Sequence, residues 1–353
     1  EAVALFMVPE YRGNPMDALA KQAVEGNARL REVVDLWDRA ALFAQAGTVG
    51  DLPEVLAQDV AQIQYTSGTT GFPKGAVLHH RGLTNNARFY AARQGAVPDD
   101  VWGGIMPLFH TAGCAMAVLG AVQNGLKLLL VPVFDPAAIL RLIDSEGMNA
   151  LLGVPTMLVA LVAAQKQMQV DVSGIRVAGS GGSMVAPDLV RSVKETFGCD
   201  FVTVYGQTES SPLIAMHYRD DPVETICSTV GQPMPQTDVS IRSMQDNSVT
   251  PIEVQGEICV RGYLVMHGYH NNAAATAAAA APEDPPGVLV LSHGFSDTPC
   301  SGFDVHQRRE NSGVLVRPSM TAPDLRRLAV TALSRSQMLL ASAGMPLEFG
   351  TPI

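Results

Sequence analysis

The sequence predicts an α/β fold in which parallel strands form sheets covered by helices, followed by a smaller β-rich region and an atypical tail. Between residues 126 and 205, short apolar runs alternate with capped amphipathic segments, as in a parallel sheet with crossover helices. From residue 229, short alternating apolar segments indicate strands. From residue 273, no periodicity is sustained. We therefore expect an α/β core over 1–228, a β-rich subdomain over 229–272 and a tail over 273–353.

Local signals define the elements of the core. Residues 126–131, LKLLLV, are almost wholly apolar, as a buried strand requires. Asp135 can cap the next helix, Pro136 suits its first position and Gly147 can end it. A helix over 187–197 has an apolar face formed by Leu189, Val190, Val193 and Phe197. We expect further strands over 150–154, 175–178 and 201–205, and a helix over 156–165.

Two loops follow neighbouring strands of this predicted sheet. The first is GSGGS over Gly179–Ser183, and the second is GQTE over Gly206–Glu209. Ligands of parallel sheets bind beyond the carboxyl ends of the strands. The small residues of the first loop would allow a flat ring to lie against the backbone, so we expect a ligand site where the two loops meet.

The segment YTSGTTGFPKG, residues 65–75, has the composition of a phosphate-binding loop. Its glycines can bring backbone N–H groups close to an anion, its hydroxyls add donors and its lysine adds a positive charge. We infer a nucleoside triphosphate as ligand. The candidate residues are Thr66, Ser67, Gly68, Thr69, Thr70, Gly71 and Lys74.

Two other interpretations of this segment fit its residues less well. A Walker A loop requires Ser or Thr directly after its lysine and then a helix, whereas Gly75 follows Lys74 and the strand-like residues 76–78 come next. A surface hairpin without function is the remaining alternative.

Four motifs in order resemble the adenylate-forming, or AMP-binding, superfamily. After YTSGTTGFPKG come PLFHTAG at 107–113, YGQTES at 205–210 and GEICVRGYLVMHGYHN at 256–271. The family includes acyl-CoA synthetases, luciferases and adenylation domains. The residues of the later motifs are most similar to those of fatty-acyl-CoA synthetases. The resemblance implies that the β-rich region is a small β-barrel-like subdomain.

The resemblance also implies a reaction and its cofactors. A carboxylate attacks the α-phosphate of ATP to give an acyl-adenylate and pyrophosphate, and the thiol of CoA then displaces AMP. The β- and γ-phosphates would be held by Ser67, Thr69, Thr70 and Lys74. Positioned hydrogen-bond donors and a positive charge neutralise phosphate charge as it moves during the reaction. Thr208 would bind the α-phosphate and Glu209 would bind Mg²⁺. Capping of a loop or helix start by Thr208 and Glu209 is the alternative.

The same comparison assigns the base and acyl sites. Tyr205 and Gly206 would lie beside the adenine that Gly181 and Gly182 flank, and His110 would gate the acyl pocket. On sequence grounds, however, Tyr205 and His110 could also be ordinary core residues. The pocket has no charged residue, so a fatty acid is our first choice and an aromatic acid our second. Its expected lining includes Phe109, His110, Gly113 and Gly179.

After Asn272 the pattern of the family is lost. We find no T-G-D segment for the ribose, and residues 195–353 contain no lysine that could serve the transition state. The composition of the tail predicts poor order. We therefore hypothesise that 273–353 is out of frame or unrelated sequence, and that the chain is either a ligase by descent or an impaired remnant that only binds nucleotide. Because the chain opens on Glu1 within a strand-like run, we also expect that the start of the N-terminal domain is missing.

Composition limits the partners and the compartment. The 353 residues are 47% hydrophobic, enough for a large core, and carry 24 basic against 34 acidic side chains. A net charge of −10 offers no footprint for nucleic acid. The five cysteines are scattered, and no apolar run reaches the roughly 20 residues of a membrane span. We expect a cytoplasmic enzyme with small-molecule substrates, and the sequence does not fix its oligomeric state.

Overall fold

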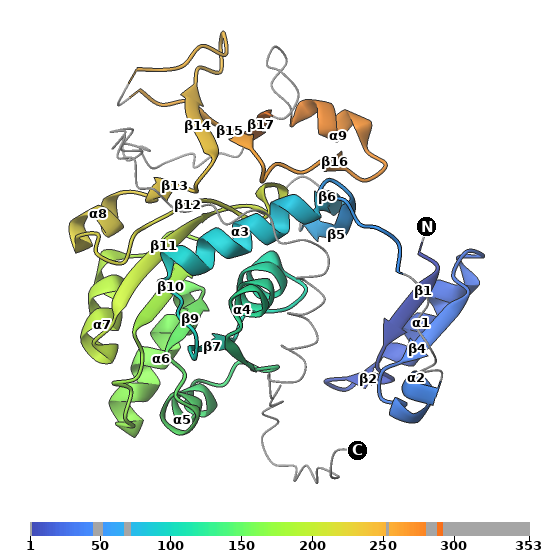
Figure 1. Ribbon diagram of the computed structural model, residues 1–353, viewed down its shortest axis with the longest axis horizontal. Helices are drawn as coiled ribbons and strands as arrows, with labels where there is room; N and C mark the ends of the chain where they lie inside the picture. The colour runs from blue at the N-terminus through green and yellow to red at the C-terminus, as the bar shows by residue number, and fades with distance from the viewer. Residues whose placement is uncertain (1, 45–51, 67–71, 252–253, 280–287, 292–353) are drawn as a thin grey trace. The chain divides into compact units, whose positions relative to one another are not determined.

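The computed structural model describes residues 2–44, 52–66, 72–251, 254–279 and 288–291. The chain divides into two compact units, residues 1–55 and 56–353, and each is described by itself (Figure 1).

The first unit is a two-stranded parallel sheet with a crossover helix. Strand β1 (Ala4–Met7) pairs with β4 (Glu32–Asp35), and α1 (Met16–Glu25) lies between them in sequence. A short hairpin of β2 (Glu10–Tyr11) and β3 (Asn14–Pro15) turns at Arg12 and Gly13, both with positive φ. Helix α2 (Arg39–Ala44) follows β4. The strand expected near the start of the chain is thus confirmed.

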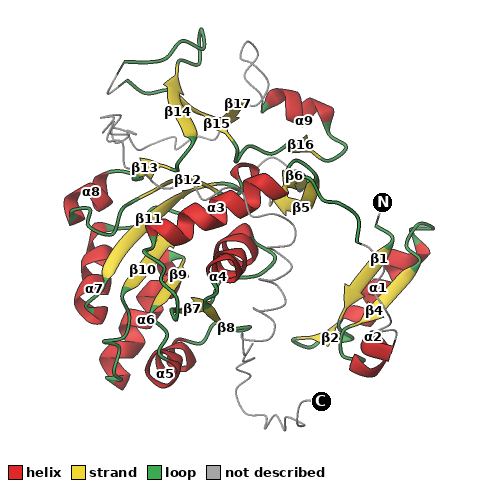
Figure 2. Cartoon of the chain, in the orientation of Figure 1, coloured by secondary structure: helices red, strands yellow, loops and turns green. Residues whose placement is uncertain are grey.

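The second unit is built on a seven-stranded sheet of order β13-β12-β11-β10-β9-β7-β8. Five strands are parallel to one another, and at one edge β11 pairs antiparallel with β12 and β12 pairs antiparallel with β13. The parallel strands are β7 (Val101–Gly104), β8 (Lys127–Leu130), β9 (Ala150–Gly153), β10 (Val177–Gly181) and β11 (Asp200–Gly206). The two edge strands are β12 (Leu213–Met216) and β13 (Gln232–Pro233), and neither was predicted (Figure 2).

Helices cover both faces of this sheet because successive strand residues point to opposite sides. Leu151, Ala178 and Phe201 pack with one set of helices, whereas Leu152, Val177 and Val202 pack with the other. The first set is α5 (Pro136–Glu146), α6 (Pro155–Met168), α7 (Pro187–Phe197) and α8 (Val223–Ser228). The second set is α3 (His80–Arg93), the π-helix η1 (Ala112–Leu119) and α4 (Gly120–Asn124).

The capping, proline and glycine residues in the sequence correctly predicted helices α5 and α7. Helix α5 begins after Asp135, whose Oδ1 accepts hydrogen bonds from the amides of Ala137 and Ala138, and it ends at Gly147 in the left-handed conformation. Helix α7 has the predicted bounds. The prediction that a loop begins at Gly179 is wrong, because β10 pairs in parallel with β9 as far as Ser180 and with β11 as far as Gly181.

Two smaller sheets complete the second unit. The antiparallel hairpin of β5 (Val60–Thr66) and β6 (Lys74–His79) confirms the expected strand–loop–strand arrangement, and β16 (Gly268–Tyr269) pairs with β6. Strand β15 (Glu257–Gly262) pairs antiparallel with β14 (Thr237–Arg242) and β17 (Val288–Leu291).

Two described elements belong to the segment that we expected to be an atypical tail. They are α9 (Ala273–Ala278) and β17. The rest of that segment, 280–287 and 292–353, lies outside the described residues.

Candidate functional site

The carboxyl ends of β10 and β11 bring the two predicted loops side by side. Gly181 pairs with Val204, so Gly181 and Gly182 lie next to Tyr205 and Gly206. A Cβ on Gly181 would lie 2.4 Å from the Val204 carbonyl oxygen, and one on Gly206 would lie 2.0 Å from that of Pro212. Both positions therefore require glycine, and this edge of the sheet presents backbone rather than side chains.

Glu209 lies just beyond β11, in the 3₁₀ turn η2 (Thr208–Ser210), and is only 8% exposed. Its Oε1 accepts a hydrogen bond of 2.6 Å from the Tyr269 hydroxyl. Its backbone carbonyl accepts another, of 2.9 Å, from the amide of Met266. These bonds fix the carboxylate at the edge of the sheet, although the structure gives it no cationic partner among the described residues.

Lys74 opens β6, and its Nζ lies 4.6 Å from the centroid of the Tyr269 ring. Lys74 and Glu209, which are 135 positions apart in the sequence, therefore contact the same side chain. Thr66 faces Lys74 across the hairpin, and its hydroxyl donates to the Lys74 carbonyl at 3.3 Å. The other predicted loop residues, Ser67, Gly68, Thr69, Thr70 and Gly71, lie outside the described residues.

Thr208 begins the 3₁₀ turn and is partly exposed. The capping contacts of this turn come from Ser210, whose Oγ accepts from the Gln207 amide at 3.3 Å and donates to the Pro212 carbonyl at 2.7 Å. The Thr208 hydroxyl has no hydrogen-bond partner among the described residues, and the carboxylate of Glu209 bonds to Tyr269. Thr208 and Glu209 therefore do not cap this turn with their side chains.

His110 lies in the loop before η1, on the surface of the unit. Its Nδ1 accepts a hydrogen bond of 3.1 Å from the Ala112 amide. Partial burial of the ring lowers the pKa of His110. Both effects favour the neutral imidazole with its proton on Nε2.

The loop that carries His110 is hydrogen-bonded to the hairpin of β5 and β6. The side-chain amide of Gln64, on β5, donates to the Phe109 carbonyl, while the Phe109 ring is 80% exposed. Gly113 allows the loop to close, because a Cβ there would lie 2.2 Å from the Pro107 carbonyl oxygen. The hairpin and the expected acyl-pocket loop are therefore neighbours.

Two predicted residues occupy more buried positions. Gly179 lies within β10, where a Cβ would meet a methyl group of Leu152 at 2.9 Å, so it belongs to the sheet and not to a loop. Tyr205 is partly buried and packs against an apolar cluster formed by Ile214, Ile258, Val260, Tyr263 and Leu264.

Tyr269 and Gln64 contact this site without having been expected there from the sequence. Tyr269 stands inside the quoted motif GEICVRGYLVMHGYHN, but its contacts depend on the pairing of β16 with β6. The signal for Gln64 was available, because Gln62, Gln64 and Thr66 alternate along β5 and are its less exposed residues. Polar side chains on the inner face of a strand indicate a site rather than a core.

Comparisons with known proteins identify the family of the chain. The family model described as AMP-binding enzyme matches residues 2–270. The acyl-CoA ligase sidI of Beauveria bassiana is 38% identical over 242 residues, which cover 68% of this chain and 42% of that protein. The mitochondrial medium-chain acyl-CoA ligase ACSF2 of Rattus norvegicus is 35% identical over 217 residues, covering 60% of this chain and 35% of that protein.

A solved structure has the same fold. An ATP-bound RpMatB-BxBclM chimera matches with a TM-score of 0.70 and 25% identity over 82% of this chain and 56% of that one. The chain spans less than half the length of the curated relatives it matches. Within its described parts, no helix has the length and apolar character needed to cross a membrane. By its sequence motifs, its fold and the match over residues 2–270, the chain belongs to the AMP-binding enzyme family.

Proposed function

We propose that this protein activates a carboxylic acid with ATP and transfers the acyl group to CoA. The observation that carries the proposal is the convergence of Lys74 and Glu209 on Tyr269, beside the glycine-lined ends of β10 and β11. A cation at a phosphate-binding hairpin and a carboxylate opposite it are the groups that a nucleotide with a divalent metal requires.

The donor set fits Mg²⁺. Tyr269 occupies Oε1 of Glu209, while Oε2 accepts no hydrogen bond within the described part of the chain. The same residues contain no group of three or more His, Cys, Asp or Glu side chains that could hold a metal. Mg²⁺ is commonly bound by one or two carboxylates together with phosphates and water. When bound, the metal would neutralise charge on the phosphates.

The residues of the chain then have separate roles. The ammonium of Lys74 and the hydroxyl of Thr66 would bind and orient the outer phosphates, and the Thr208 hydroxyl would donate to the α-phosphate. Gly181 at the end of β10 and Gly206 at the end of β11 would leave room for the adenine. The neutral His110 would border the carboxylate substrate and donate from Nε2.

The substrate class is proposed to be a medium- or long-chain fatty acid. The loop residues Phe109 and Gly113 carry no charge that could pair with a polar tail. The relative ACSF2 is a medium-chain acyl-CoA ligase by name, which favours the shorter of these acids. An aromatic acid is the second candidate.

A second function is favoured by the absence of lysine after Lys194. A lysine that contacts the transition state supplies orders of magnitude in rate. The 353-residue chain would then bind ATP and an acyl-adenylate but release pyrophosphate only slowly.

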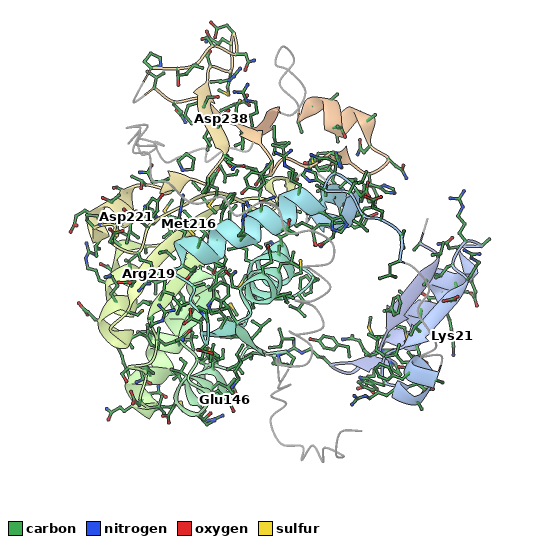
Figure 3. The ribbon with its side chains drawn as sticks, viewed as in Figure 1. Lys21, Glu146, Met216, Arg219, Asp221 and Asp238 are labelled. Atoms are coloured by element: carbon green, nitrogen blue, oxygen red, sulfur yellow. The ribbon has the colours of Figure 1, made fainter. Side chains whose placement is uncertain are left out.

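Calorimetry with ATP, Mg²⁺ and a non-hydrolysable acyl-adenylate mimic, together with a pyrophosphate-release assay, tests both functions. Binding with steady turnover supports the ligase, and binding without turnover supports the remnant. Glu209→Gln should abolish most Mg²⁺-dependent binding. The matched control is Glu146→Gln at the end of α5, which is paired with Lys127 at 2.6 Å and lies at the bottom of the view in Figure 3. Equal binding by both variants would contradict the proposal.

A further inference from the structure

Tyr269 has two charged neighbours of opposite sign. Its hydroxyl donates to Oε1 of Glu209 at 2.6 Å, and the Lys74 ammonium lies 4.6 Å from the centre of its ring. The first contact is a charge-assisted hydrogen bond and the second is a cation–π contact. Lys74 and Glu209 form no direct ion pair among the described residues.

We propose that Tyr269 is a positioning residue that holds Lys74 and Glu209 in one site while keeping them apart. This inference rests on the function proposed above. A direct ion pair would neutralise both groups before a nucleotide arrived. With the phenol between them, Glu209 keeps its second oxygen for the metal and Lys74 keeps its three N–H donors for phosphate.

The backbone around Tyr269 is fixed from several sides. Tyr269 pairs with Ala76 of β6, and its amide donates to the Thr276 hydroxyl of α9 at 2.9 Å. The Asn272 amide donates to the Tyr269 carbonyl at 3.2 Å. Gly268 has a φ of +144°, and a Cβ there would lie 2.8 Å from the Thr276 methyl group. The ring is therefore held where both charges meet it.

Two substitutions of Tyr269 in the full chain separate its two contacts. Tyr269→Phe removes the hydroxyl and keeps the ring. ATP affinity with Mg²⁺ should then fall by about 10-fold or more, which is the usual loss when a residue that hydrogen-bonds to a metal ligand is replaced. ATP affinity in EDTA should be unchanged, because Lys74 keeps its contact with the ring. Tyr269→Leu should weaken ATP binding in both conditions, since Lys74 is then free to pair with Glu209. Calorimetry gives the affinities, and thermal unfolding checks that each variant folds.

Tyr218→Phe is the matched control. The Tyr218 ring lies 4.5 Å from the Arg93 guanidinium, and its hydroxyl accepts from that group at 3.4 Å, but it contacts neither Lys74 nor Glu209. This variant should bind ATP like the unaltered chain, with Mg²⁺ and without it.

Three results would overturn the inference. If Tyr269→Phe binds ATP and Mg²⁺ normally while Glu209→Gln does not, Tyr269 has no positioning role and the proposed function stands. If Tyr269→Phe loses affinity equally with Mg²⁺ and in EDTA, the hydroxyl does not act through the metal carboxylate. If the unaltered chain binds no ATP with Mg²⁺, the proposed function fails and the inference fails with it.

Discussion

In the N-terminal unit, residues 1–55, a single described side chain, Ala20, is buried, whereas the unit of residues 56–353 buries four apolar clusters. Both units have hydrogen-bonded strands and helices. In the first unit, however, large apolar side chains stay in water: Phe6 is 61% exposed, Trp37 63% and Phe43 61%. Local sequence signals are therefore sufficient to form elements, but the burial that stabilises them is concentrated in the second unit.

The largest expected effect is a difference between the two units in how far a Phe→Ala substitution lowers the free energy of unfolding. Phe201 is 0% exposed and Phe6 is 61% exposed. Phe201→Ala leaves a cavity between β11 and α7 and should lower the free energy of unfolding by about 3–5 kcal/mol. Phe6→Ala should change it by about 0.5 kcal/mol or less.

The two tryptophans allow each unit to be followed separately during urea unfolding. Trp37 belongs to the first unit and Trp102, 4% exposed, to the second. Trp37→Phe leaves Trp102 as the reporter for Phe201→Ala, and Trp102→Phe leaves Trp37 for Phe6→Ala. Equal losses in the two units would contradict the difference in burial.

Acid should affect the second unit more than the first, which contains no histidine. His217 is fully buried, with Nδ1 2.6 Å from the Thr203 hydroxyl and Nε2 2.8 Å from that of Thr229. Desolvation lowers the pKa of His217 below its ordinary value of 6.5. The unfolded chain therefore binds more protons, and stability is lost as the pH falls below 6.5.

The loss from His217 should not exceed about 1.4 kcal/mol per pH unit. Unfolding free energies of the second unit at several pH values between 7.5 and 5.5 measure it. His217→Gln should reduce the slope, even if the variant is less stable throughout. An unchanged slope would assign the acid sensitivity to other groups, such as His79, whose pKa is also lowered by burial.

The smallest expected effect concerns helix termini. Asp135 caps α5 with two hydrogen bonds, and Asp135→Ala should cost about 1 kcal/mol. Asp17 in the first turn of α1 accepts one hydrogen bond, from the adjacent Ala18 amide, on an exposed surface. Asp17→Ala should cost less than about 0.5 kcal/mol. Denaturation followed with the tryptophan of each unit distinguishes the two values, and a larger loss in α1 would reverse the comparison.

The elements that sequence reasoning located are those specified by neighbouring residues. Helix α5 has a cap, a proline and a terminal glycine within its own span, and α7 has an apolar face and Gly198. The end of β10 and the strands β12 and β13 were not located, because their extent depends on partners distant in the sequence. Pairing across a sheet has no local signal.

The site follows the same rule. Lys74, Thr208 and Glu209 stand in motifs whose composition already indicates phosphate and metal chemistry. Tyr269 acquires its contacts only when β16 joins β6, about 190 positions away along the chain. The roles of Ser67, Gly68, Thr69, Thr70 and Gly71 stay predictions, as do the division at 228 and 272 and the out-of-frame tail.

Strand β17 covers the edge of β15 in the three-stranded sheet of order β14-β15-β17. Through Val288 to Leu291 it pairs with residues 258–261 of β15, whose Ile258 and Val260 belong to a buried cluster. A polypeptide cut after Asn272 would lose this partner and the Thr276 hydroxyl. Its β15 would then present unsatisfied amides and carbonyls beside apolar side chains, a template on which a second molecule can add a strand. Shortening the protein to its recognisable motifs would therefore favour aggregation.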